Sequence, residues 1–198
     1  MILIVITFSL TAYARNMAWS DKVTLWEDVV KQSPYKARPH LNLGQAYEEK
    51  GRVDDAIKEY QTAITLKPDQ AGPHFNLGGI YRRQNRLDDS VREYQTAITL
   101  KPDQAETHFN LAGVYHKQGR LDDAIKEYQT AINLKPDHAR AHNNLGVTYH
   151  HQGRFDEAIK EYQTAINLNP DYAEAHKNLR MLYQERASLE EASINVRR

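Results

Sequence analysis

The hexapeptide EYQTAI occurs four times in the chain, at 59–64, 93–98, 127–132 and 161–166. Each occurrence begins 34 residues after the previous one. Prolines recur with the same spacing, at Pro34, Pro68, Pro102, Pro136 and Pro170. A constant period of this length indicates a repeat protein, in which each unit is one supersecondary element stacked on its neighbours.

Within one unit, residues 105–138, the sequence predicts two helices separated by a short break. The first helix has an apolar face with helical spacing, formed by His108, Leu111, Ala112 and Tyr115. The break falls at Gly119, because glycine readily takes the positive φ angle at which many helices end. The same place is held in the other units by Gly51, Asn85 and Gly153. The second helix contains EYQTAI and ends before the proline, which cannot continue a helix.

This spacing resembles the tetratricopeptide repeat (TPR), whose signature is a large residue, Leu, Gly, Tyr, Ala, an aromatic residue, Ala and Pro within about 34 residues. In the first unit these are His40, Leu43, Gly44, Tyr47, Ala56, Tyr60, Ala63 and Pro68. Histidine replaces the Trp of the family in every unit, Ala112 replaces the Gly in the third, and Ser90 replaces the first Ala in the second. The resemblance covers residues 37–172 and implies an all-α fold, a right-handed α-solenoid of antiparallel helix pairs.

The register of the repeat divides the chain into segments. Residues 1–16 resemble a membrane anchor or signal, and 17–36 an N-terminal half-repeat helix with Trp26 in the aromatic position. Four full TPR units are expected at 37–70, 71–104, 105–138 and 139–172. Residues 173–198 are predicted to form a C-terminal capping helix and a tail that is frayed from Ser188. Arg180 stands where the repeat has glycine, so we expect no further repeat to stack normally on this helix.

Met1 to Tyr13 contains no charged side chain, and these 13 residues are too few to cross a bilayer, which takes about 20 helical residues. Three interpretations stay open: the end of a longer transmembrane helix, a signal peptide or anchor, and a packed N-terminal helix. The segment that follows resembles the join in transmembrane-TPR proteins related to protein O-mannosyltransferases. This resemblance implies a membrane-anchored or extracytoplasmic protein, with a cytoplasmic one as the alternative.

The composition excludes several classes of function. Because 26 Lys and Arg balance 26 Asp and Glu, the net charge gives no long-range attraction to nucleic acid. Without cysteine there is no disulfide, thiolate catalyst or zinc ribbon. The sequence contains no plausible catalytic triad and no glycine-rich phosphate loop. We therefore expect no enzyme, cofactor or metal site, and a protein or peptide as the partner.

The second helices of the four units are nearly unchanged, whereas the first helices diverge. In the TPR family the first helices line a concave groove, so selection of a ligand would produce divergence there. One groove position is invariant: Asn42, Asn76, Asn110, Asn144 and Asn178. A side-chain amide matches the donors and acceptors of an extended peptide backbone. The series resembles the asparagine ladder in the TPR superhelix of the O-linked N-acetylglucosamine transferase, which grips substrate backbone. The alternative is that these amides only bond to the neighbouring repeat.

Other groove positions predict selectivity. Phe75 and Phe109 occupy one position in adjacent units and form a candidate apolar anchor, with core packing as the alternative. A basic and histidine-bearing wall comprises Arg82, Arg83, His116, Lys117, His150 and His151. We interpret its histidines as a pH-sensitive grip rather than metal ligands, because the repeat fixes no acidic or thiolate side chain beside them.

The expected function is a scaffold that binds an extended peptide or partner segment in the groove. Two alternatives remain. The chain can be the soluble TPR tail of a larger multi-pass membrane protein that resembles a glycosyltransferase, or a structural subunit that associates with itself through its unpaired end helices.

Overall fold

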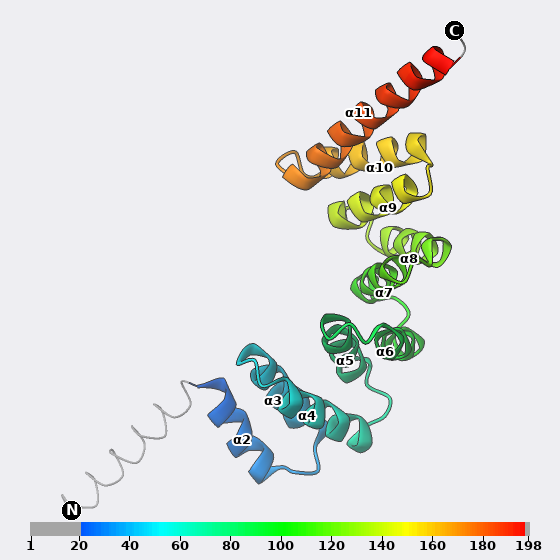
Figure 1. Ribbon diagram of the computed structural model, residues 1–198. Coiled ribbons are helices and arrows are strands. Elements are labelled where there is room, and N and C mark those ends of the chain that lie inside the picture. The colour runs from blue at the N-terminus through cyan, green and yellow to red at the C-terminus, as the bar shows by residue number, and fades with distance from the viewer. Residues whose placement is uncertain (1–20, 197–198) are drawn as a thin grey trace, which may run out of the picture. The chain divides into compact units, whose positions relative to one another are not determined.

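The computed structural model describes residues 21–196, and these residues form helices and turns but no strand (Figure 1). The helices are α2 (Lys22–Gln32), α3 (Ala37–Glu49), α4 (Val53–Leu66), α5 (Ala71–Arg83), α6 (Leu87–Leu100), α7 (Ala105–Lys117), α8 (Leu121–Leu134), α9 (Ala139–His151), α10 (Phe155–Leu168) and α11 (Ala173–Val196). The predicted all-α fold is confirmed. Within this range, every helix is too short or too polar to cross a bilayer. The predictions for residues 1–16 lie outside the described residues.

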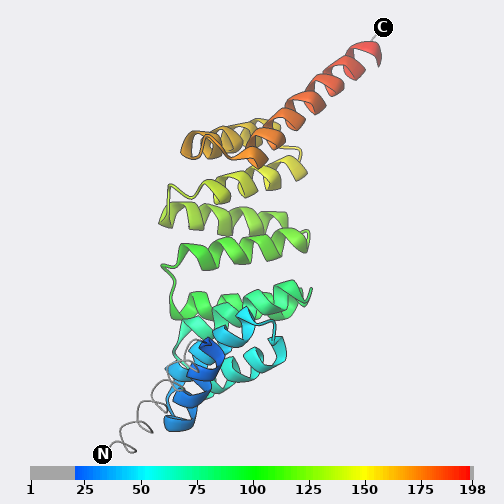
Figure 2. The ribbon, with the colours of Figure 1, turned by 90° about the vertical axis from the view of Figure 1, so that its left-hand side faces the viewer.

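The chain divides into two compact units, one that ends at Ile80 and one that begins at Tyr81. In the first unit α3 pairs with α4, and α2 packs against α3. In the second unit α7 pairs with α8 and α9 with α10, and each second helix also contacts the next first helix (Figure 2). This alternation of helix pairs is the packing of an α-solenoid.

Small and aromatic side chains allow the helices of a pair to approach closely. Three positions of α4 and the same three of α10 have no exposed surface: Ala56, Tyr60, Ala63, Ala158, Tyr162 and Ala165. The tyrosine ring lies directly against the glycine of the first helix. A Cβ atom placed on Gly146 would be 2.7 Å from Cε1 of Tyr162. In the first and fourth units the ring thus leaves no room for a side chain at this position, whereas the third unit has the small residue Ala112 there.

The histidine that replaces the Trp of the repeat forms hydrogen bonds in addition to packing. Nδ1 of His108 lies 2.6 Å from Oε2 of Glu127, and its Nε2 lies 3.0 Å from the carbonyl oxygen of Pro102. His40 and His142 make the same two contacts in their repeats. Because a carbonyl oxygen only accepts, Nε2 donates the hydrogen in its contact. The histidine thus joins the first helix to the second helix and to the preceding loop, so the predicted packing role was incomplete.

The predicted break between helices is confirmed, since Gly51, Gly119 and Gly153 have φ angles of 74°, 74° and 73°. Asn85 has a φ angle of 61°, in the same left-handed region. The arginine that follows each of these residues lies over the tyrosine of the first helix and pairs with an acid in the first turn of the second. Arg120, for example, lies 4.2 Å from the ring centre of Tyr115 and 2.6 Å from Asp123. These contacts hold the short loop in a single arrangement.

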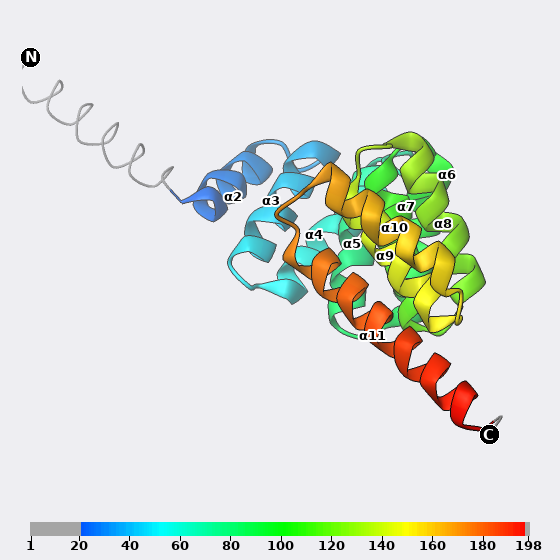
Figure 3. The same ribbon diagram turned by 90° about the horizontal axis from the view of Figure 1, so that it is seen from above.

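The last helix differs from the prediction. Ala187 stands where the other repeats have glycine or asparagine, and α11 runs past it to Val196 instead of giving way to a frayed tail from Ser188. The C-terminal half of α11 extends beyond α9 and α10 (Figures 2 and 3). Exposed apolar side chains occur along it, with 49% of Met181, 47% of Tyr183 and 52% of Leu189 accessible. Without a residue suited to a positive φ angle the helix has no reason to stop.

Candidate functional site

The invariant asparagines lie on the first helices and are only partly accessible. Asn42, Asn76, Asn144 and Asn178 are half-buried, and Asn110 is 8% exposed. In the second unit two of these amides bond to Asn143, which is not one of the invariant asparagines. Nδ2 of Asn178 donates to Oδ1 of Asn143 at 3.0 Å, and Nδ2 of Asn143 donates to Oδ1 of Asn144 at 3.2 Å. Asn178 thus makes an inter-repeat bond of the kind that was the alternative to peptide binding, whereas the partner of Asn144 lies on the same helix.

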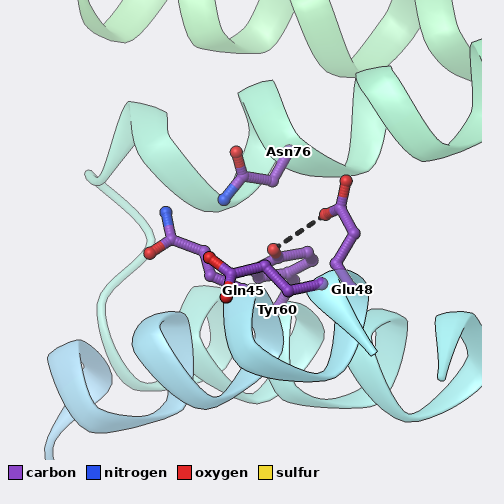
Figure 4. A pocket seen from close by; sticks show the side chains of 5 residues that line it. Gln45, Glu48, Tyr60 and Asn76 are labelled. Carbon is purple, nitrogen blue, oxygen red and sulfur yellow. Dashed lines mark hydrogen bonds between the residues drawn. The ribbon is translucent and has the colours of Figure 1, made fainter. Parts of the chain in front are cut away.

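The first unit contains a pocket of about 490 Å³ between α3, α4 and α5 (Figure 4). Its lining consists of Gln45, Glu48, Glu49, Tyr60 and Asn76. The hydroxyl of Tyr60 donates to Oε2 of Glu48 at 3.0 Å. The pocket therefore has a tyrosine at its base, an asparagine from the next repeat on one side, and two carboxylates on the other.

The second unit contains a pocket at the same place in the repeat, with a volume of about 220 Å³. It is lined by Gly113, His116, Tyr128, Asn144, Val147 and Glu174. Gly113, His116, Tyr128 and Asn144 correspond to Gln45, Glu48, Tyr60 and Asn76, two periods earlier in the sequence. We call the two sites the Tyr60 pocket and the Tyr128 pocket. Sequence reasoning missed the tyrosine as a groove residue, because its place in the repeat pattern indicates core packing.

Two arginines, Arg82 and Arg140, act electrostatically on Tyr128. Burial raises the pKa of Tyr128 to about 12, while a hydrogen bond from Asn144 and the charges of Arg82 and Arg140 act in the opposite direction. A Cβ atom on Gly113 would lie 3.6 Å from the Tyr128 hydroxyl and 3.9 Å from Nη1 of Arg82. The absence of a side chain at Gly113 thus leaves this hydroxyl and this guanidinium open to the pocket.

The two residues of the predicted apolar anchor belong to different units, Phe75 to the first and Phe109 to the second. Phe109 is only 4% exposed, and its ring centre lies 4.8 Å from that of His138 and 5.8 Å from that of Tyr128. The guanidinium of Arg140 lies 5.0 Å from the centre of the same ring. Phe75 is half-buried on α5. The contacts of Phe109 are those of a core residue, which was the alternative interpretation.

Two histidines of the predicted wall, His116 and His151, lie together in the second unit. Nε2 of His116 lies 3.0 Å from Nδ1 of His151, and their rings stack with centres 4.9 Å apart. His150 points instead to α11, with Nε2 2.7 Å from Oε2 of Glu185. Of the basic residues, Arg83 and Lys117 are exposed and Arg82 is half-buried. Within residues 21–196, no three His, Asp or Glu side chains lie close enough together to hold a metal ion.

His116 gives this wall an expected pH dependence. Burial, and then the neighbouring His151, lower the pKa of His116 below its usual value of 6.5. His116 binds a proton less readily in the folded state than in the unfolded chain. Its contribution to the free energy of unfolding is therefore fully present above about pH 6.5 and is lost as the pH drops through the lowered pKa. We expect His116→Gln to flatten the decline of unfolding free energy between about pH 7 and pH 5, measured by urea denaturation. Replacement of the exposed His176 by Gln is the control, and parallel curves for wild type and His116→Gln would contradict the assignment.

Comparisons with known proteins agree with this architecture. A family model described as TPR repeat matches residues 47–84, 78–119 and 113–153, and one described as Tetratricopeptide repeat matches 139–172. Comparison with curated proteins finds no match. The solved structure of MamA is 28% identical, covers 76% of this chain and 88% of its own, and superimposes with a TM-score of 0.71.

Two further solved structures are below 25% identity and show the fold alone. YrrB, described as a TPR protein with an unusual peptide-binding site, is 20% identical, covers 86% of this chain and 88% of its own, with a TM-score of 0.70. A chain of the Cut9–Hcn1 complex is 20% identical with a TM-score of 0.72, and covers 79% of this chain but 32% of its own. The repeat period, the helix pairs and the matched family models together show that the chain belongs to the tetratricopeptide-repeat family.

Proposed function

We propose that this chain is a binding scaffold that holds an extended peptide, or an extended segment of a partner protein, along the first helices of its repeats. The TPR fold itself supports a role in protein interaction. The observation that carries the finer proposal is the recurrence of one polar pocket, with an asparagine and a tyrosine, in both units. An identical polar position in successive repeats suits a ligand that is itself periodic, and a peptide backbone is such a ligand.

The asparagines have the capacity for this role even where they bond within the protein. Asn144 receives one hydrogen bond from Asn143 at 3.2 Å and gives one to Tyr128, and its amide has two donors and two acceptor positions. Asn76 lines the Tyr60 pocket, where its side chain faces the space above Tyr60 (Figure 4). YrrB is a member of the same fold class and is described as having a peptide-binding site.

The test combines Asn76→Ala, Asn110→Ala and Asn144→Ala in one variant. Peptides selected against the wild-type chain from a random library should bind this variant about tenfold more weakly or worse, since each lost hydrogen bond contributes roughly 1 kcal/mol. Affinity is measured by fluorescence anisotropy, and circular dichroism checks that the helices remain.

The control changes Asn133 and Asn167, which are exposed residues at one equivalent position of the second helices α8 and α10. Their replacement by Ala should leave peptide affinity unaltered. If the first-helix variant binds the selected peptides as tightly as wild type, the asparagines hold the repeats together and do not grip the ligand.

A further inference from the structure

The Tyr60 and Tyr128 pockets occupy the same place in the repeat but differ in charge. In the Tyr60 pocket the residue beside the tyrosine is Glu48, which accepts the hydrogen bond of the tyrosine hydroxyl at 3.0 Å. The equivalent residue in the Tyr128 pocket is His116, and glycine replaces Gln45. The tyrosine and the asparagine are therefore common to both pockets, and the divergent positions determine the polarity of each.

Three hydrogen-bond donors lie at or beside the Tyr128 pocket. Arg82, on α5, lies next to the pocket residue Gly113, with Nη1 3.9 Å from the place that a Cβ atom of Gly113 would occupy. The Tyr128 hydroxyl lies 3.6 Å from that same point. Asn144 contributes an amide on the side of α9. A guanidinium, a hydroxyl and an amide that converge on one small space form a site that suits an oxygen anion.

The charges around this pocket indicate how much negative charge it can accept. Arg82 and Arg140 act on Tyr128 as positive charges, and Glu174 lies on the pocket wall as a negative one. Burial keeps the pKa of His116 low, so this ring is neutral at pH 7. Two positive charges and one negative charge leave an excess of one positive charge, which a single carboxylate neutralises. A doubly charged phosphate would add a second negative charge next to Glu174, which is unfavourable.

We propose that the Tyr128 pocket binds the carboxylate of an aspartate or glutamate side chain from the partner segment, and that it selects this side chain over neutral and cationic ones. This inference rests on the proposed function, because the segment must lie along the first helices to deliver the side chain. Arg82 supplies the charge-assisted hydrogen bonds, and Tyr128 with Asn144 fixes the position of the carboxylate oxygens.

The probes are four dodecapeptides of Gly and Ser with blocked ends and one central residue, which is Glu, Gln, Lys or phosphoserine. They are titrated into the full ¹⁵N-labelled chain, and amide signals are followed by NMR. The Glu peptide should shift the amide signals of Gly113 and Asn144. It should bind about tenfold more tightly than the Gln peptide, because charge-assisted hydrogen bonds are stronger than neutral ones. It should not shift Gln45, which belongs to the carboxylate-rich Tyr60 pocket and provides an internal control.

Two variants link the preference to the pocket. Arg82→Glu should reverse it, so that the Lys peptide binds more tightly than the Glu peptide at Gly113 or its neighbours. Gly113→Gln should fill the pocket and remove the difference between Glu and Gln peptides without changing the charge. The control is Lys126→Glu, an exposed charge change on α8. It should leave the preference for Glu intact.

The outcomes separate this inference from the proposed function. If the peptides bind but the Glu, Gln and Lys peptides have equal affinities measured at the Gly113 signal, the carboxylate site is wrong. The proposed peptide-binding groove is then unaffected. Tighter binding of phosphoserine than of Glu overturns the single-charge argument. If none of the peptides shifts any first-helix signal, both the site and the groove are rejected.

Discussion

Gly146→Leu is expected to lower the free energy of unfolding by about 3 kcal/mol or more, which makes it one of the most damaging single changes available to this fold. A Cβ atom at Gly146 would lie 2.7 Å from Cε1 and 2.8 Å from Cδ1 of Tyr162, and 3.2 Å from the carbonyl oxygen of Ala158. Tyr162 has no exposed surface, so its ring cannot move aside without opening the core. Urea denaturation of the variant and of wild type gives the difference directly.

Gly113→Leu is the matched control, because Gly113 lies in the next helical position of an equivalent first helix. A Cβ atom there would lie 3.6 Å from the nearest atom, the hydroxyl oxygen of Tyr128. Later repeats have Val147 and Met181 at the same position. We expect this variant to change stability by less than about 1 kcal/mol, since removal of a mid-helix glycine is itself favourable. Equal losses in the two variants would show that helix propensity, and not contact with the tyrosine, decides the outcome.

His142→Ala is expected to cost about 2 to 3 kcal/mol. The change removes a buried side chain and leaves two acceptors without their donor, Oε2 of Glu161 at 2.6 Å and the carbonyl oxygen of Pro136 at 3.3 Å. The side chains of His142 and Glu161 are 11% and 18% exposed, so water compensates only in part. The unfolding free energies of His142→Ala, Glu161→Gln and the double variant form a cycle that isolates the pair.

His176 provides the control for this change, since it has the same place in the repeat but no second helix follows α11 within the described residues. Its imidazole bonds to the carbonyl oxygen of Pro170 at 2.8 Å and is exposed. We expect His176→Ala to cost less than about 1 kcal/mol, because water can replace its one partner. A loss as large as that of His142→Ala would mean that the glutamate contributes little in the full repeats.

The period of EYQTAI was sufficient to predict the helix pairs, because each apolar stripe, break and proline recurs in the same register. The contact of His108 with Glu127 was not predicted, although the glutamate is the first residue of that hexapeptide. Spacing along the chain shows which residues share a helix face. It does not show which residue on the neighbouring helix lies opposite, since this depends on the angle and distance between the helices.

The candidate site was predicted in part for the same reason. The asparagine position was correctly placed on the first helices, yet the tyrosine hydroxyl at the base of the pocket was assigned to the core. Phe109 was expected in the groove, but His138 from the end of its own repeat and Arg140 from the following repeat cover its ring. For α11, the substitution of Ala187 for glycine was visible in the sequence. Alanine favours continuation of a helix, so this substitution, and not the missing hexapeptide, decides the length of α11.

The near identity of the second helices has a consequence for how the chain finds its native pairing during folding. The first helix of any repeat meets almost the same surface on the second helix of any other, so a pairing displaced by one whole repeat would bury similar side chains. Side-chain chemistry therefore discriminates weakly between native and displaced pairs. The three-residue connection, with its left-handed glycine or asparagine, does so strongly, because closing a longer loop costs more entropy. In this protein the shortness of the connections, more than the identity of the surfaces, determines which helices become partners.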